Sequence, residues 1–264
     1  MLNFRAAIFD MDGVVTKTTS LHSLAWKNTF DEFLRGREQT HGEAFREFTH
    51  NGDYLPYVDG RPRYIGVETF LKSRQITLPL GTPEDEPRAQ TICGLGNRKN
   101  QLFNRLIEEG KVELYDSTLE LIHGLRSCGV RVGLATSSKN GDLILRKAGI
   151  AELFEARVDG IVSARLGLRG KPEPDIFTTA CGMLGVAPEH SIVFEDAVSG
   201  VQAGAKGDFA LVIGIAREQN ARELKMSGAD VVVEDLAEAR IDTINQWVVD
   251  KIALVSTAQT PELK

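Results

Sequence analysis

The sequence lacks several features that would assign it to a specialised class of protein. It has no apolar run near the roughly 18 residues that a membrane span needs, and no basic leader followed by a long apolar stretch. Its three cysteines are odd in number and widely scattered, which argues against a disulfide framework. The net charge of −6 provides no basic surface for nucleic acid or anionic lipid. We therefore expect a cytoplasmic protein, a monomer or weak homo-oligomer, that binds neither nucleic acid nor membrane.

Short apolar runs alternate with helical patterns through most of the 264 residues. The apolar runs are continuous rather than alternating, which indicates a parallel sheet buried on both faces, that is, a doubly wound α/β core. The expected strands are 5–11, 130–136, 191–195, 209–215 and 230–233, with a weaker one at 158–162. The expected helices are 117–127, 141–148, 175–184, 199–205, 218–226 and 239–249.

Residues 18–101 interrupt this alternation, because they contain helical stretches such as "LHSLAWKNTFDEFLRG" and "RKNQLFNRLIEEG" but no good strand. Proline and glycine at "DGRPR" and "PLGTPEDEP" separate these stretches. We predict a helical domain at 18–101, inserted into a core formed by 1–17 and 102–264. The "GLG" at 94–96 follows no strand and is therefore not a dinucleotide-binding fingerprint.

Polar side chains follow several predicted strands at the point where each strand ends. Ligands of parallel sheets bind beyond the carboxyl ends of the strands, at the switch point of strand order. The residues expected at this edge are Asp10, Asp12, Thr136, Ser137, Ser138, Lys171, Glu195 and Asp196. So many carboxylates in one place are electrostatically costly, which indicates that a cation binds them. Oxygen ligands that also meet a phosphate suit Mg²⁺.

These residue types fit phosphoryl transfer. With the metal held by Asp10 and Asp196, Asp10 can attack phosphorus and form an aspartyl phosphate. Asp12 can move the proton of the leaving or attacking oxygen, while Lys171 and Thr136 bind the phosphoryl oxygens. A calcium loop is the competing interpretation of the aspartate pair, but it needs further acids that "VVTKTTS" lacks.

Four segments resemble, in the right order, the motifs of the haloacid dehalogenase (HAD) superfamily: "DMDGVVT", "ATSSKN", "GKPEPDIF" and "FEDAVSGVQAG". The helical insert resembles the helical cap of that superfamily, and the chain most resembles its β-phosphoglucomutase group. The resemblance implies that Asp10 is the nucleophile and that Asp12 is the acid/base, with its main-chain carbonyl on Mg²⁺. It also implies Thr136 and Lys171 as phosphate ligands, and Glu195 with Asp196 as further parts of the metal site.

The resemblance further implies contacts with a small phosphorylated substrate, a sugar phosphate. The residues concerned are Thr18 and His22 at the hinge and cap, Arg63 for the non-transferring phosphate, Lys99, and Ser138, Lys139 and Asn140 in a core loop. From the residues alone, His22 could equally be a core-edge histidine, and Arg63 and Lys99 solvated surface charges. The chain departs from the group at Gly66, where a serine is expected, and at Arg61, which is a second arginine.

Three functions stay open from the sequence. A phosphatase would pass the phosphoryl group from Asp10 to water, whereas a mutase would pass it to a sugar phosphate and take it back after the bisphosphate reorients. A mutase needs a cation in the cap and a site that excludes water, and Arg63 and Lys99 could supply the cation. The third possibility is a non-catalytic binding domain, against which the intact set of nucleophile, acid, lysine and metal ligands argues.

Overall fold

The computed structural model describes residues 2–258, of which 255–258 are described by their backbone only. The chain divides into two compact units, one formed by Met1–Lys17 with Leu114–Lys264 and the other by Thr18–Glu113. We call them the core unit and the cap unit. The first boundary lies where the sequence suggested it, but the expected return at residue 102 falls inside helix α4 (Ile92–Glu109). The sequence prediction therefore ended the helical unit too early.

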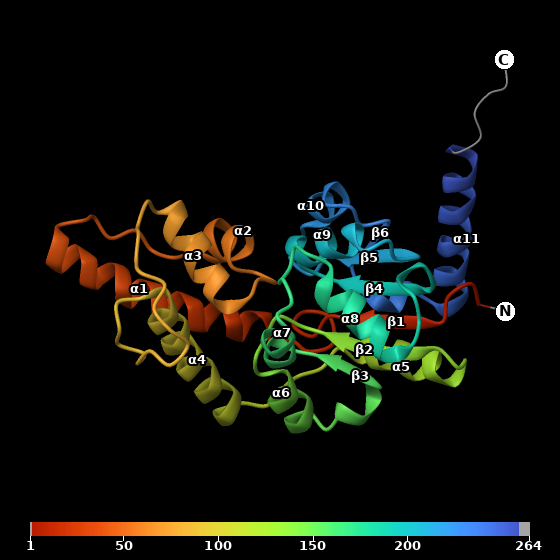
Figure 1. The fold of residues 1–264 in the computed structure, drawn as a ribbon, viewed down its shortest axis with the longest axis horizontal. Coiled ribbons are helices and arrows are strands. Elements are labelled where there is room, and N and C mark those ends of the chain that lie inside the picture. Colours follow the sequence, from red (N-terminus) through yellow and green to blue (C-terminus); the bar gives the residue numbers. More distant parts are fainter. Residues whose placement is uncertain (1, 259–264) are drawn as a thin grey trace, which may run out of the picture. The chain divides into compact units, whose positions relative to one another are not determined.

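The core unit contains one six-stranded parallel sheet with the strand order β3-β2-β1-β4-β5-β6 (Figure 1). The order reverses between β1 and β4, because β2 and β3 extend the sheet on one side of β1 and β4 to β6 on the other. This is the predicted doubly wound topology. The strands are β1 (Ala6–Phe9), β2 (Arg131–Ala135), β3 (Ala156–Val158), β4 (Ser191–Glu195), β5 (Leu211–Ile215) and β6 (Val231–Val233).

Burial on both faces explains why the strands are continuous apolar runs. All of β1 is buried, and its side chains alternate between Ile8, which joins a cluster with Phe177 of α8 and Val201 of α9, and Phe9, which stacks on Phe194 at 4.3 Å. The helices of this unit are α5 (Asp116–Ser127), α6 (Gly141–Lys147), α7 (Gly160–Leu166), α8 (Asp175–Leu184), α9 (Val198–Lys206), α10 (Ala221–Met226) and α11 (Ile241–Ala258).

The weak strand expected at 158–162 lies earlier in the chain than predicted. Strand β3 ends at Val158, and helix α7 begins at Gly160. The reason is the side chain of Asp159, which accepts hydrogen bonds from the backbone amides of Ile161 and Val162 at 2.9 and 2.8 Å. A side chain that caps a helix in this way starts the helix at once, so the apolar residues after Asp159 become helical.

The cap unit is built from helices, as the sequence indicated, and no strand is assigned between residues 18 and 113. Its helices are α1 (Thr19–His41), a π-helical turn (His50–Tyr54), α2 (Leu55–Tyr57), α3 (Arg63–Ser73) and α4 (Ile92–Glu109). An aromatic cluster holds them together, in which the Phe30 ring lies 4.1 Å from that of Phe70 and 5.2 Å from that of Phe48. Within the described residues, no helix combines the length and hydropathy needed to cross a bilayer.

Candidate active site

The site lies at the carboxyl ends of β1 and β4, next to the point where the strand order reverses. The backbone amide of Asp10 donates to the carbonyl of Phe194 at 3.0 Å, which continues the pairing of the two strands by one residue. The chain then turns at Gly13, whose φ of 88° is open to glycine and strained for other residues. This turn carries Asp12 towards β2, where the hydroxyl of Thr136 lies 3.5 Å from the Asp12 carboxylate.

A buried lysine lies between two carboxylates. The Lys171 ammonium is 2.5 Å from Asp10 and also forms an ion pair with Glu195. The three residues are 2%, 5% and 0% exposed, respectively. Charges this far from water are stable only when they are paired, so the lysine and the two acids depend on one another.

The electrostatics of this trio favour a bound cation. Burial raises the pKa of Asp10 well above its ordinary value, Lys171 opposes that rise, and the nearby Glu195 and Asp12 add to it. Burial lowers the pKa of Lys171, but the carboxylates of Asp10 and Glu195 outweigh this and raise it overall. The lysine therefore stays charged and only partly compensates the acids around it.

Asp10, Glu195 and Asp196 form an acidic cluster suited to a metal ion. Each offers a carboxylate oxygen, the three oxygen atoms lie within 4.8 Å of one another, and all three residues are buried. An oxygen-only donor set of this kind fits a hard divalent cation such as Mg²⁺ better than a softer metal.

Glycine at position 200 allows Glu195 to occupy its place. The Glu195 carboxylate accepts a hydrogen bond from the backbone amide of Ala197 at 2.7 Å and lies against the start of α9. A Cβ atom built on Gly200 would lie 1.6 Å from Glu195 Oε1, inside the carboxylate. The glycine is therefore needed because the acid approaches the helix backbone so closely.

We expect Gly200→Ala to destabilise the protein by about 2 kcal/mol, because the added methyl group must push the buried Glu195 carboxylate away. It should also weaken Mg²⁺ binding, measured by calorimetric titration. Gly182→Ala in α8 is the matched control, since a Cβ there meets nothing within 4 Å. In a helix interior that control should be neutral or slightly stabilising. Equal free energies of unfolding for the two variants would contradict this role of Gly200.

The loop after β2 continues the site. The Thr136 hydroxyl accepts a hydrogen bond from the Ser138 amide at 3.1 Å, and the Ser138 hydroxyl accepts one from the Asn140 amide at 3.2 Å. The Ser138 carbonyl accepts from the amide of Gly160 at 2.9 Å, which fastens the loop, and with it Lys139, to the segment after β3. The structure therefore brings together all the predicted core residues of this loop.

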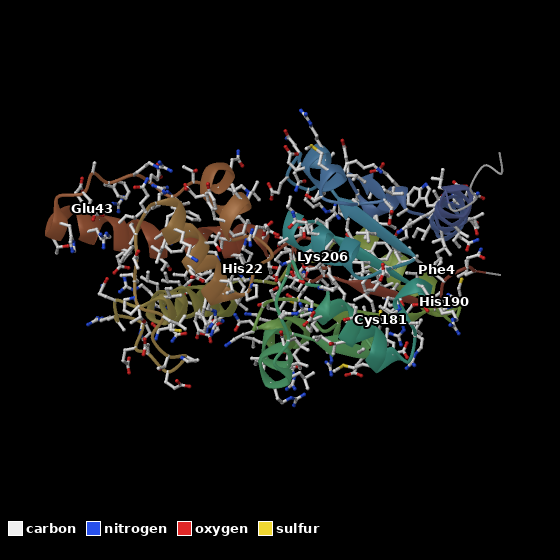
Figure 2. The ribbon with its side chains drawn as sticks, turned by 45° about the horizontal axis from the view of Figure 1, so that its top comes forward. Phe4, His22, Glu43, Cys181, His190 and Lys206 are labelled. Atoms are coloured by element: carbon white, nitrogen blue, oxygen red, sulfur yellow. The ribbon has the colours of Figure 1, made fainter. Side chains whose placement is uncertain are left out.

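Two predicted cap residues meet within the cap unit. Lys99 of α4 lies 2.5 Å from the ring nitrogen Nδ1 of His22 on α1, which Figure 2 labels. The His22 ring stacks on Phe103 at 3.9 Å, and the Lys99 ammonium lies over the rings of Phe103 and Trp26. The partners of the ammonium group therefore include two aromatic faces and an imidazole.

The other two predicted cap residues lie at the starts of helices. Thr18 is buried at the N-cap of α1, where its carbonyl accepts from the His22 amide. Arg63, the first residue of α3, donates to the Asn100 side chain of α4 at 2.7 Å, and burial lowers its pKa. Asn100 was missed at the sequence level, although it directly follows Lys99 in "RKN".

Two core residues at the end of β5 were also missed. Asn220 donates to the backbone carbonyl of Asp196 at 3.2 Å, and Arg217 donates to that of Gly13 at 3.4 Å. The signal was present, because both residues follow an apolar strand at the same edge of the sheet as the expected site. The sequence did not predict them as site residues because neither is an acid and neither belongs to one of the four motifs.

A doubly wound core with a helical unit inserted after β1, and with a buried lysine between carboxylates at the ends of β1 and β4, is the arrangement of a HAD-type enzyme. A family model described as haloacid dehalogenase-like hydrolase matches residues 4–208. The chain belongs to the haloacid dehalogenase-like hydrolase family, as the four motifs predicted.

Within this family the chain is similar to β-phosphoglucomutases. It is 44% identical over 237 residues to a protein of Mycobacterium bovis named β-phosphoglucomutase, covering 89% of this chain and 90% of that one. It is 30% identical to the protein of that name in Bacillus subtilis, with 92% and 94% covered. The solved β-phosphoglucomutase of Clostridium difficile has the same fold, with a TM-score of 0.73, 22% identity, and 95% and 99% of the two chains covered. The protein is therefore an enzyme of the hydrolase or isomerase type.

Proposed function

We propose that this protein is a Mg²⁺-dependent phosphomutase that converts β-glucose 1-phosphate into glucose 6-phosphate in the cytoplasm. The observation that carries the proposal is the 44% identity, across about nine-tenths of both chains, with a protein named β-phosphoglucomutase. The buried set of Asp10, Lys171, Glu195 and Asp196 supplies groups of the types that phosphoryl transfer requires.

Asp10 and Asp12 have separate tasks in the proposed reaction. Phosphorylated Asp10 gives its phosphoryl group to the 6-hydroxyl of β-glucose 1-phosphate, and the proton of that hydroxyl passes to Asp12. The bisphosphate then reorients, and the freed Asp10 carboxylate attacks the phosphorus at position 1. The oxygen at position 1 leaves with the proton from Asp12, which regenerates the phosphorylated enzyme. The Gly13 turn, which brings Asp12 back beside Thr136, supports this division of labour.

The remaining core groups would stabilise charge. Asp10, Glu195 and Asp196 would hold Mg²⁺, together with the main-chain carbonyl of Asp12, and the bound ion would neutralise charge on the phosphoryl oxygens. The Lys171 ammonium and the Thr136 hydroxyl would bind the same oxygens. Lys171 suits this task because its partners keep it charged.

The predicted substrate residues would select the sugar phosphate. Arg63 would bind the phosphate that is not being transferred. Its hydrogen bond to α4 goes to Asn100, a neutral amide that does not neutralise the guanidinium, so its positive charge can attract an anion. Lys99 and His22 would meet the substrate together, because they already contact each other, with Thr18 at the hinge. Ser138, Lys139 and Asn140 would face the sugar from the fastened loop after β2.

One experiment separates the possible reactions. The protein is incubated with Mg²⁺, β-glucose 1-phosphate and a trace of glucose 1,6-bisphosphate, while glucose 6-phosphate and inorganic phosphate are followed together. Formation of glucose 6-phosphate without release of phosphate is the expected result. Release of phosphate alone would replace the mutase by a phosphatase, and the absence of both products would overturn the proposed substrate. Parallel samples with EDTA test the requirement for metal.

A further inference from the structure

Arg217 follows β5 and reaches the loop after β1 in two ways. Its Nε atom donates to the carbonyl of Gly13 at 3.4 Å, and its guanidinium lies over the ring of Tyr115 at 3.8 Å. A guanidinium can stack and donate hydrogen bonds at once, because it is flat and carries donors along its edge. Its side chain is 12% exposed, so both contacts are largely shielded from water.

Tyr115 is itself tied to that loop. Its backbone amide donates to the carbonyl of Val15 at 3.1 Å, and the neighbouring residues Thr16 and Leu114 form an isolated antiparallel bridge. One further contact comes from α5, where the Thr118 hydroxyl donates to the carbonyl of Val14 at 2.7 Å. Residues 13–16 are therefore held by Arg217 directly and also through the tyrosine on which Arg217 stacks.

Arg217 is fixed from its other side. Its Nη1 atom donates to the carbonyl of Glu234 at 3.2 Å and forms an ion pair with Asp235. Partial burial raises the pKa of Asp235, but hydrogen bonds from Arg217 and Ser117 outweigh this and lower the pKa to about 2. The Asp235 side chain also accepts from the amide of Ala237 and so caps the short helix at Leu236–Glu238. The arginine is thus anchored to a well-defined structural element after β6.

We infer that Arg217, in the segment directly after β5, is a positioning residue that fixes the loop after β1 and thereby the place of Asp12. This inference rests on the proposed role of Asp12 as the acid/base. The loop needs such support because it leaves the sheet after Asp10, whose amide still pairs with Phe194, and turns at Gly13. Asn220, three residues further along the same segment, similarly donates to the backbone carbonyl of Asp196 at 3.2 Å.

The position of this loop should affect proton transfer by Asp12 more than it affects substrate binding. An acid that must reach two different oxygens within one cycle loses efficiency when its carboxylate moves by an ångström, and such misplacement can reduce the rate about 100-fold. Arg217 contacts backbone carbonyls, a tyrosine ring and the Asp235 carboxylate, and none of these groups is proposed to bind substrate. Its loss should therefore lower kcat and leave KM nearly unchanged.

The test combines kinetics with hydrogen exchange. For Arg217→Ala we expect kcat for β-glucose 1-phosphate to fall roughly 10- to 100-fold, with KM changed by less than about threefold. We also expect the backbone amides of Gly13, Val15 and Thr16, which bond within the loop, to exchange roughly tenfold faster in mass-spectrometric measurements. Arg217→Lys keeps the positive charge but loses the planar guanidinium group. We therefore expect a smaller fall in kcat and a smaller increase in amide exchange than for Arg217→Ala.

The control is Arg131→Ala. Arg131 also forms an ion pair with an acid, Glu155. It is the first residue of β2 and therefore lies at the end of that strand opposite to the candidate site. This variant should leave both kcat and the exchange of residues 11–16 unchanged. Unaltered exchange in the Arg217 variants, or an equal loss of kcat in the control, would overturn the inference. If the wild-type protein does not turn over β-glucose 1-phosphate, the proposed function fails, while the exchange result still decides whether Arg217 fixes the loop.

Discussion

Asp10→Asn should abolish phosphoryl transfer while leaving the protein folded. An amide oxygen carries no full negative charge and cannot form the aspartyl phosphate, so we expect kcat/KM to fall by about four orders of magnitude or more. The loss should appear with every phosphorylated substrate, because the same group acts in both the mutase and the phosphatase reactions.

The stability of this variant should change little. Asparagine has the size of aspartate and can still accept a hydrogen bond from Lys171, which keeps Glu195 as its ion-pair partner. Burial and the neighbouring acids already raise the pKa of Asp10, so removing its charge relieves repulsion as well as losing an attraction. We therefore expect the free energy of unfolding to stay within about 1 kcal/mol of the wild-type value.

Activity is measured by product formation, stability by urea denaturation, and the intermediate by transfer of radioactive phosphate from labelled glucose 1,6-bisphosphate to the protein. Asp230→Asn is the matched control, because Asp230 pairs with Lys251 away from the site. That variant should keep its activity and become labelled. Substantial turnover by Asp10→Asn, or labelling of it, would exclude Asp10 as the nucleophile.

The sheet and the core of the site were predictable because one physical cause underlies both. Strands buried on both faces must be apolar throughout, so the polar residues that follow them, such as Asp10, Thr136 and Glu195, stand out in the sequence. Parallel strands then bring those residues to the same edge. Neither step requires knowledge of side-chain contacts.

What the sequence did not reveal depends on contacts between distant residues. The end of β3 is set by a side chain that caps the next helix, and apolar periodicity does not report such caps. The end of the cap unit was missed because α4 carries Lys99 near its middle and continues to Glu109 without a break. Arg217 was missed because its importance lies in stacking on Tyr115, about a hundred residues earlier in the chain.

Lys171→Met should have the largest effect on stability. The substitution keeps the length of the side chain but removes the cation that pairs with both Asp10 and Glu195. Breaking a buried pair in this way costs about 3–5 kcal/mol, because the remaining charges stay buried without compensation. Activity should also fall by about 100- to 1,000-fold, since a charged donor to the phosphoryl oxygens is lost.

The deficit in stability should depend on conditions that neutralise the acids. Added Mg²⁺ should stabilise this variant more than the wild type, because the ion supplies the positive charge that Lys171 no longer provides. The deficit should also shrink as the pH falls, because the pKa of Asp10 is already raised by burial and Lys171 no longer opposes that rise, and a protonated acid needs no partner. Urea denaturation with EDTA or with Mg²⁺, at several pH values, measures both effects.

Lys206→Met is the control for this change, because Lys206, labelled in Figure 2, pairs with Glu173 at 2.8 Å and is about half exposed. A surface pair contributes less than about 1 kcal/mol, and its loss should not alter the response to Mg²⁺. Similar stabilities for the two variants would show that Lys171 does not compensate the acids. The contrast with Asp10→Asn follows from the two ion pairs of Lys171. When either acid is lost the lysine keeps the other as its partner, whereas loss of the lysine breaks both ion pairs at once.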